Sequence, residues 1–157
     1  MPNLLEAENL AVEALEAVLN ANGWADGWRL TDSEVRASRK PLYYRNSAPV
    51  VAPENKIKKS GQTHNLYAIY SITQNEPVYG SNKAGFFTVR IAITFYYDDA
   101  FLFSRGTNLF RSYISDVVDA LANDLWIISS EGESPLTSPE DGNKYLNRKI
   151  LFLDKTF

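Results

Sequence analysis

Three short groups of acidic residues have the types and spacing that could do chemistry: Asp98-Asp99, Glu131 with Glu133, and Glu140-Asp141. Paired carboxylates can cleave a glycosidic bond or bind a hard cation. Neighbouring residues of a strand or loop point in different directions, however, and turns favour Asp. These groups are therefore interpreted as solvated acids of turns, and we expect no metal site from them.

The chain contains one histidine, His64, and no cysteine. A lone His cannot build a two-His metal site, and without Cys there is neither a disulfide framework nor thiolate chemistry. A Ser-His-Asp arrangement could use only His64, and the sequence has no Gly-x-Ser-x-Gly turn and no glycine-rich phosphate loop. We therefore predict that the chain is not an enzyme and uses no cofactor or metal. A small ligand-binding or hydrolytic α+β domain built on Asp98, Asp99 and His64 stays open as the alternative.

Length and charge fit one structural domain. The 157 residues are 45% hydrophobic and 22% charged, as in ordinary globular proteins. The net charge of −3 does not favour a protein that binds phosphate backbones, and Lys56, Lys58 and Lys59 are interpreted as a solvated loop cluster. Residues 1–21 carry four Glu and no basic residue, so we expect no signal peptide. No apolar run reaches the roughly 20 residues that span a bilayer, so no membrane partner is expected.

Two amphipathic helices are predicted. The first lies within residues 3–23, with Asn3 as N-cap, Glu6 three residues later and Gly23 at its end. The second begins at Thr107 or Asn108 and runs to about Asn123. Apolar residues at helical spacing predict two buried stripes: Leu4, Ala7, Leu10, Ala11, Ala14, Leu15 and Val18 in the first helix, and Leu109, Phe110, Tyr113, Ile114, Val117, Val118, Leu121 and Leu125 in and after the second.

The remaining elements are predicted to be strands and loops. Strands are expected at 66–73, 86–97, 125–129 and 145–153, with shorter ones near 28–31 and 41–45. Long loops are expected near 46–65 and 130–143, because both segments are polar and contain Pro and Gly. This order does not alternate strand and helix, as a parallel sheet would require. The sequence therefore predicts one α+β domain over 1–157, with a mainly antiparallel sheet, a long central hairpin and two amphipathic helices packed on one face.

The strand predicted over 86–97 has two unlike faces. Every second residue from Phe87 is apolar, which predicts a buried face under the helices: Phe87, Val89, Ile91, Ile93, Phe95 and Tyr97. The alternate set includes Phe86, Arg90, Ala92 and Tyr96, and it is neither polar nor apolar throughout. Arg90 argues against a dry layer over this second face unless a carboxylate pairs with it, because a buried unpaired charge is very costly.

Aromatic residues crowd the strands, and some must lie outside the core if helices cover only one sheet face. Interface cores are enriched in Tyr and Phe, so this excess indicates a partner surface. We predict five interface residues: Tyr43, Tyr44, Phe86, Arg90 and Tyr96. The alternative is a third layer, in which the long loop folds across these side chains.

The hairpin and the helix after it resemble tail terminator proteins (tail completion or neck proteins) of tailed bacteriophages. The resemblance is carried by LYAIYS at 66–71, EPVYGSNK at 76–83 and TVRIAITFYYD at 88–98. In that family a strand carrying a Tyr is followed by a polar turn with Tyr and Asn, a long alternating strand and a helix. Tyr67, Tyr79 and Asn82 occupy those places, and the opening helix also matches. A related minor tail or head–tail connector protein is the other reading of the same pattern.

The resemblance implies a structural role in the virion tail or neck, with assembly in the host cytoplasm. Such proteins form a homo-oligomeric ring, commonly a hexamer, at the head-proximal end of the tail tube. The ring ends tube polymerisation and joins the tail to the head connector, so the implied partners are other copies of the chain, the tube protein and the head-completion protein. DNA would pass through the lumen without sequence-specific binding, and a net negative protein suits that passage.

Overall fold

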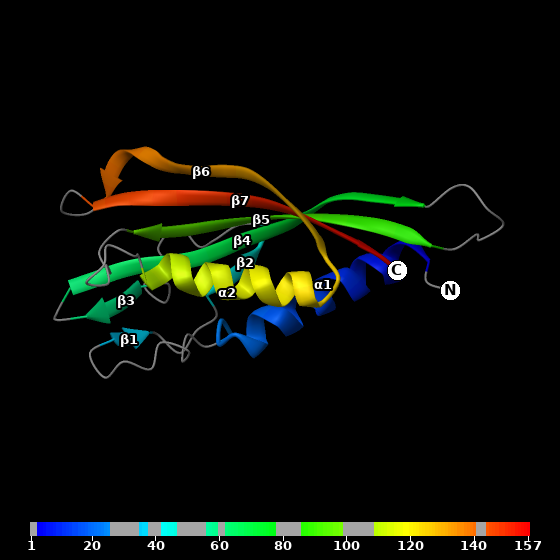
Figure 1. Ribbon diagram of the computed structural model, residues 1–157, viewed down its shortest axis with the longest axis horizontal. Helices are drawn as coiled ribbons and strands as arrows, with labels where there is room; N and C mark the ends of the chain where they lie inside the picture. Colours follow the sequence, from blue (N-terminus) through cyan, green and yellow to red (C-terminus); the bar gives the residue numbers. More distant parts are fainter. Residues whose placement is uncertain are drawn as a thin grey trace.

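A computed structural model describes residues 3–25, 35–37, 42–46, 56–59, 62–77, 86–98, 109–140 and 144–157. Within these residues, seven strands form one sheet, and two helices lie along one of its faces (Figure 1). One strand pair is parallel and the other described pairs are antiparallel. This arrangement confirms the predicted α+β fold.

The strands, in chain order, are β1 (Val35–Ala37), β2 (Tyr43–Arg45), β3 (Lys56–Lys59), β4 (Gln62–Pro77), β5 (Phe87–Asp98), β6 (Ile127–Glu140) and β7 (Lys144–Thr156). Their order in the sheet is β1-β3-β4-β5-β7-β6, and β2 runs parallel to β4. The long β4–β5 pair is the predicted central hairpin, with a register shift between Ile72 and Gln74. Because β5 lies between β4 and β7, its side chains set the character of both sheet faces.

One face of the sheet forms the core. The predicted set on β5 is buried from Val89 to Tyr97, and Phe87 packs against its edge. The flanking strands β4 and β7 contribute further buried side chains to this face: Leu66, Ala68, Tyr70, Leu151 and Leu153. Trp24 meets Phe95 edge to face, with 5.5 Å between ring centroids. The alternation along β5 therefore predicted its buried face correctly.

Helix α1 (Leu4–Ala21) begins with the predicted capping box. The backbone N–H of Glu6 donates to Asn3 Oδ1 at 2.9 Å, and the N–H of Asn3 donates to Glu6 Oε2 at 3.1 Å. Gly23 adopts a left-handed φ of 82° just after the helix, as expected for a glycine that ends it. The buried side is Ala7, Ala11, Val12, Leu15 and Leu19.

The predicted stripe of α1 was wrong at Leu4 and Leu10, which are both exposed. The small side chains of Ala7 and Ala11 are fully buried, so the helix meets the sheet along this alanine edge. Val12 and Leu19 extend that buried side, and the core contact is rotated away from Leu10. Two apolar side chains that the pattern assigned to the core are therefore available on the surface.

Helix α2 (Leu109–Asn123) buries Phe110, Ile114, Val117 and Leu121, in agreement with its predicted stripe. Leu125, the last residue predicted in that stripe, is 81% exposed and has a φ of 65°. The helix has already ended at this point, and the chain reverses through a left-handed residue before β6. Trp126 is buried in its place. The amino group of Lys155 donates to Asp124 O at 2.7 Å and so ties the end of β7 to the end of α2.

The long loops expected near 46–65 and 130–143 were wrong where the structure describes strands. Residues 56–59 and 62–65 belong to β3 and β4, and β6 extends to Glu140. Pro135 and Pro139 made this last segment look like a loop, but β6 is the terminal strand of the sheet order, where Pro is tolerated. The pairing of β6 with β7 shifts register between these two prolines. Residues 47–55 and 141–143, and the short strand expected near 28–31, lie outside the described residues.

Candidate assembly interface

The second face of the sheet lies opposite the helices, and we call it the open face. Pairing across β4, β5 and β7 brings its side chains into rows: Tyr67, Tyr96 and Arg148; Ile69, Thr94 and Ile150; Ser71, Ala92 and Phe152. These side chains are partly exposed, and Ile69, Ile150 and Phe152 lie outside the hydrophobic core. In the part of the chain that the structure describes, both helices pack on the other face, so neither covers this one.

An aromatic pair marks one end of the open face. The rings of Tyr67 and Tyr96 stack with 4.9 Å between centroids and an interplanar angle of 20°. Arg148 stands beside Tyr96 in the register, and its Nε atom is shielded from water with no hydrogen-bond partner. A shielded guanidinium N–H without an acceptor is unfavourable.

An ion pair marks the other end of this face. Arg90 donates from Nε to Asp154 Oδ1 at 2.7 Å and from its terminal nitrogen to Oδ2 at 2.9 Å. Its guanidinium carbon also lies 5.7 Å from the ring centre of Phe152. The hydrogen bonds to Asp154, followed by its charge, raise the pKa of Arg90 above its ordinary value. The side chains are 40% and 22% exposed. Asp154 is thus the carboxylate that Arg90 needs if another layer covers this face and excludes water. The charge of Arg90 therefore does not prevent a partner from covering the face.

The structure places the five predicted interface residues on different surfaces. Tyr44, Arg90 and Tyr96 belong to the open face, since Tyr44 pairs with Ile69 and the other two alternate with buried residues of β5. Phe86 is exposed just before β5 begins. Tyr43 instead faces α1: its hydroxyl donates to Asn20 Oδ1 at 2.7 Å, and its ring lies 6.3 Å from that of Tyr70.

Sequence reasoning missed the contribution of β7 to the open face. Arg148, Ile150 and Phe152 lie on this face, while Lys149 and Leu151 lie on the other. Both alternating sets of β7 mix apolar and charged residues, so a period of two alone could not assign their sides. The available signal was the register with β5, which the sequence does not contain.

A polar cluster on the helix side holds α1 against the sheet. The Tyr70 hydroxyl donates to Glu16 Oε1 beneath α1, close to Tyr43 and Asn20. Burial, followed by the hydrogen bond with Glu16, raises the pKa of Tyr70 above its ordinary value of 10. Burial and the Glu16 charge likewise raise the pKa of Tyr43, which its bond to Asn20 partly counteracts. The carboxylate thus has a structural hydrogen-bonding role.

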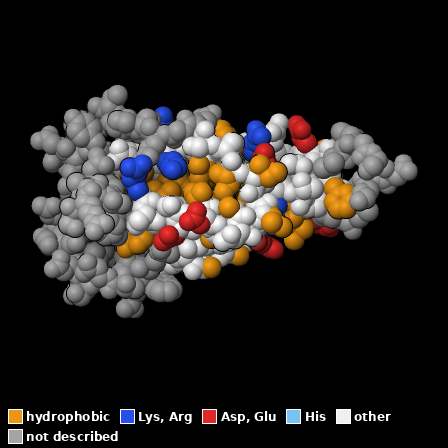
Figure 2. Space-filling view, viewed as in Figure 1, with side chains coloured by type: hydrophobic (Ala, Val, Ile, Leu, Met, Phe, Trp, Pro, Cys, Tyr) orange, Lys and Arg blue, Asp and Glu red, His pale blue; other side chains and the backbone are white. Residues whose placement is uncertain are grey.

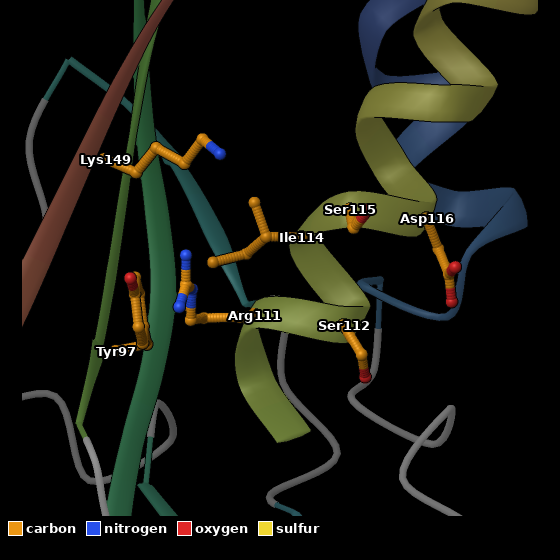
Figure 3. A pocket seen from close by; sticks show the side chains of 7 residues that line it. All are labelled: Tyr97, Arg111, Ser112, Ile114, Ser115, Asp116 and Lys149. Atoms are coloured by element: carbon orange, nitrogen blue, oxygen red, sulfur yellow. The ribbon is translucent and has the colours of Figure 1, made fainter. Parts of the chain in front are cut away.

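A cavity of about 400 Å³ lies between α2 and the strands β5 and β7. Arg111 of α2 and Lys149 of β7 extend toward this gap beside Tyr97, while Ser112 and Asp116 point away from the strands (Figure 3). The lining combines two cationic groups with the Asp116 carboxylate, three hydroxyl-bearing side chains and the apolar Ile114. Register also places Glu133 of β6 opposite Lys149.

The residues of the alternative hydrolytic site are only partly described. Leu66 pairs with Tyr97, so the backbones of His64 and Asp98 lie near the same end of the β4–β5 pair. The side chains of His64 and Asp98, like Asp99 as a whole, lie outside the described part of the structure. The side chains of Glu131, Glu133, Glu140 and the three lysines of β3, with residue Asp141, also lie outside it.

Several exposed hydrophobic side chains gather toward the end of the molecule that carries both termini. They are Leu4, Leu5, Leu10, Phe86, Leu125 and Ile127. The backbones of Phe87 and Phe157 bond to each other there, and Asn75 donates to Leu4 O at 2.8 Å. Figure 2 shows hydrophobic side chains in several groups on the face it presents, with acidic and basic side chains between them.

None of the described helices is long and apolar enough to cross a membrane. Among the described residues, no three His, Asp or Glu side chains lie close enough to hold a metal ion. No protein-family model and no curated protein matches this chain.

Proposed function

We propose that this chain is a structural, non-enzymatic virion protein of the tail terminator kind, whose copies assemble into a ring through the open face. The observation that carries the proposal is the sheet face that neither described helix covers, where Ile69, Ile150 and Phe152 are partly exposed. Apolar side chains that stay partly exposed on one sheet face often mark a partner-binding surface. The resemblance of the 66–98 hairpin to phage tail terminators supports other copies of the chain and tail proteins as the partners.

A one-sided surface is compatible with ring formation. The open face differs from the helix-covered face, so a contact between unlike surfaces of neighbouring copies is heterologous and closes into a ring when the rotation permits. Fully burying an Ile or Phe side chain contributes about 1.5–3 kcal/mol. Ile69, Ile150 and Phe152 are already partly buried in the single chain, so covering them contributes only part of this amount, which helps to offset the entropy lost on association.

In the virion, the ring would sit at the head-proximal end of the tail tube. One side of the ring would stop tube growth, because no further tube subunits add to it. The other side would contact the head connector. DNA would pass through the lumen, where the net charge of −3 per copy disfavours adhesion to phosphate. A hexamer is the expected stoichiometry, by resemblance to the family.

The proposal is tested by native mass spectrometry and negative-stain imaging at high protein concentration, alone and with the tail tube protein encoded in the same genome. We expect closed rings, and tubes of limited length capped at one end. Thr94→Glu, in the middle of the open face, should abolish the rings, because it puts an unpaired charge into the contact. Ser115→Glu, on the exposed side of α2, is the matched control and should assemble normally.

A chain that stays monomeric under all these conditions, tube protein included, contradicts the proposal. Rings that form equally well with Thr94→Glu would show that assembly uses another surface.

A further inference from the structure

The cavity between α2 and the sheet has the size of a small-molecule site. Its volume of about 400 Å³ lies in the range of roughly 300–1,000 Å³ that is usual for ligand pockets. Tyr97 of β5 and Lys149 of β7 line it from the sheet, and residues of the first half of α2, Arg111 and Ile114 among them, line it from the helix. Three elements thus surround one space on the helix-covered side of the sheet.

Tyr97 brings a polar group to the wall of this cavity. Its side chain is only 1% exposed, and its hydroxyl has no hydrogen-bond partner among the described residues. Buried polar groups are normally hydrogen-bonded, because an unpaired one has lost its contact with water without compensation. A hydrogen-bond acceptor placed in the cavity would supply this partner.

Two cationic side chains extend into the cavity from opposite walls. Figure 3 shows Arg111 reaching from α2 toward the strands, and Lys149 reaching from β7 toward α2. Asp116 also lines the cavity, but its carboxylate points away from the strands (Figure 3). The first turn of α2, which holds Arg111, adds the partial positive charge of a helix N-terminus. The space between helix and strands therefore favours a negatively charged ligand.

Both cationic groups have donors to offer such a ligand. Arg111 already has interactions within the chain, but a guanidinium has several N–H donors and can hold a ligand in addition. Lys149 has no ion pair with a described side chain. The residue opposite it in the register of β6 is Glu133, whose side chain lies outside the described part of the structure.

We propose that this cavity binds a small organic oxyanion, that is, a phosphate or carboxylate group carried on an apolar body. Arg111 and Lys149 would donate to the oxyanion, with the Tyr97 hydroxyl as a third donor. The buried Ile114 and the ring of Tyr97 would contact the apolar body. The cavity lies on the inner side of the sheet, so the site does not use the open face and goes beyond the proposed ring.

NMR titrations that follow the backbone amides test the site with three probes of similar size: phenyl phosphate, benzoate and benzamide. Benzamide has the shape of benzoate without its charge, so it is the matched control and should not bind. We expect saturable shift changes with at least one anion, centred on the amides of Tyr97, Arg111 and Lys149. The anion that binds more tightly identifies the group as phosphate or carboxylate. Saturation by neither anion, or equal binding of benzamide, would overturn the proposal.

Single substitutions test which charges hold the anion. Lys149→Gln and Arg111→Gln should each raise the dissociation constant roughly tenfold, because each removes a charged hydrogen bond to the oxyanion. Arg148→Gln removes the same charge from the neighbouring position of β7, but on the open face, so it is the matched control and should leave the affinity unchanged. Tyr97→Phe keeps the ring and removes a neutral donor, so it should weaken binding by a smaller factor.

The two lysine and arginine variants of β7 decide the outcome. A loss of affinity in Lys149→Gln that is absent from Arg148→Gln supports the site. Equal losses in both would show that net charge attracts the anion, and would overturn the proposal. Lys149 is partly exposed, so its substitution should leave the fold intact, which circular dichroism checks. A chain that forms no ring but binds the anion would contradict the proposed function and leave this site standing.

Discussion

The two faces of the sheet are made from the same strands, but the side chains of one face are buried and those of the other stay partly exposed. On the inner face, the side chains of β5 from Val89 to Tyr97 are buried under α1 and α2. On the open face, Thr94 and Tyr96 of the same strand stay partly exposed. Both faces carry apolar and aromatic residues. The two faces differ because both described helices cover the inner face and neither covers the open face. The open face is therefore the candidate for contact with another molecule.

The largest expected effect is the difference in stability loss between truncating an isoleucine of the inner face and truncating one of the open face. Ile91→Ala should lower the free energy of unfolding by about 2–5 kcal/mol, because the removed atoms leave a cavity in a closed core. Ile150→Ala, three register positions away on the neighbouring strand and with its side chain on the other face, should cost about 1 kcal/mol or less in the monomer. Urea denaturation of both variants at low protein concentration measures the difference. Equal losses would mean that the open face is part of the core.

Removing the hydroxyl of a tyrosine on each face compares the two faces for a polar group. Tyr70→Phe removes the hydroxyl that donates to Glu16 beneath α1, and should cost about 1–3 kcal/mol of folding free energy. Tyr96→Phe, on the open face, should change stability by only about 0.5 kcal/mol. Thermal and urea unfolding of the two variants, compared with wild type, gives these values. A neutral Tyr70→Phe would show that water replaces the lost hydroxyl.

Alkaline pH should affect the inner face first. The folded-state pKa of Tyr70 is raised above 10, so above pH 10 the unfolded chain releases this proton while the folded chain retains it. The stabilising contribution is therefore full below pH 10 and is lost as the pH rises toward the folded pKa. Wild type should lose stability more steeply in this range than Tyr70→Phe, with parallel curves at neutral pH. Identical slopes above pH 10 would exclude the role assigned to this hydroxyl.

The smallest expected effect concerns the ion pair on the open face. Asp154→Asn removes the charge opposite Arg90, and exposed pairs of this kind contribute little to stability. The loss should shrink further as salt is raised, because exposed charges are screened. Urea unfolding at low and high ionic strength measures it, with Arg90→Gln as the companion variant. A large, salt-independent loss would indicate that the pair is shielded from water.

The sequence was most informative where one periodicity dominated. The α1 capping box, the buried stripe of α2 inside the helix and the core face of β5 all follow from local spacing. Predictions failed where a local signal competed with distant pairing. Pro135 and Pro139 resemble a loop, yet a strand at the end of the sheet order tolerates them. Leu10 fits an apolar stripe, yet the alanine edge of α1 meets the sheet in its place.

The candidate interface depended still more on tertiary structure. Tyr43 and Tyr44 look equivalent in the sequence, but consecutive strand residues point to opposite faces, so one bonds to α1 and the other joins the open face. Arg148 was not distinguished because the unsatisfied state of its Nε depends on the neighbours that β5 and β7 bring to it.

The sequence by itself determined the helices, the long central strand and the apolar half of that strand, because spacing along the chain encodes which side chains share a face. Only the tertiary structure decided that β7 lies on the other side of β5 and that Asp154 pairs with Arg90. Both features depend on contacts between residues far apart in the chain. Burial of the inner face stabilises these contacts together. Because both described helices pack on the inner face, neither covers the other side of β5.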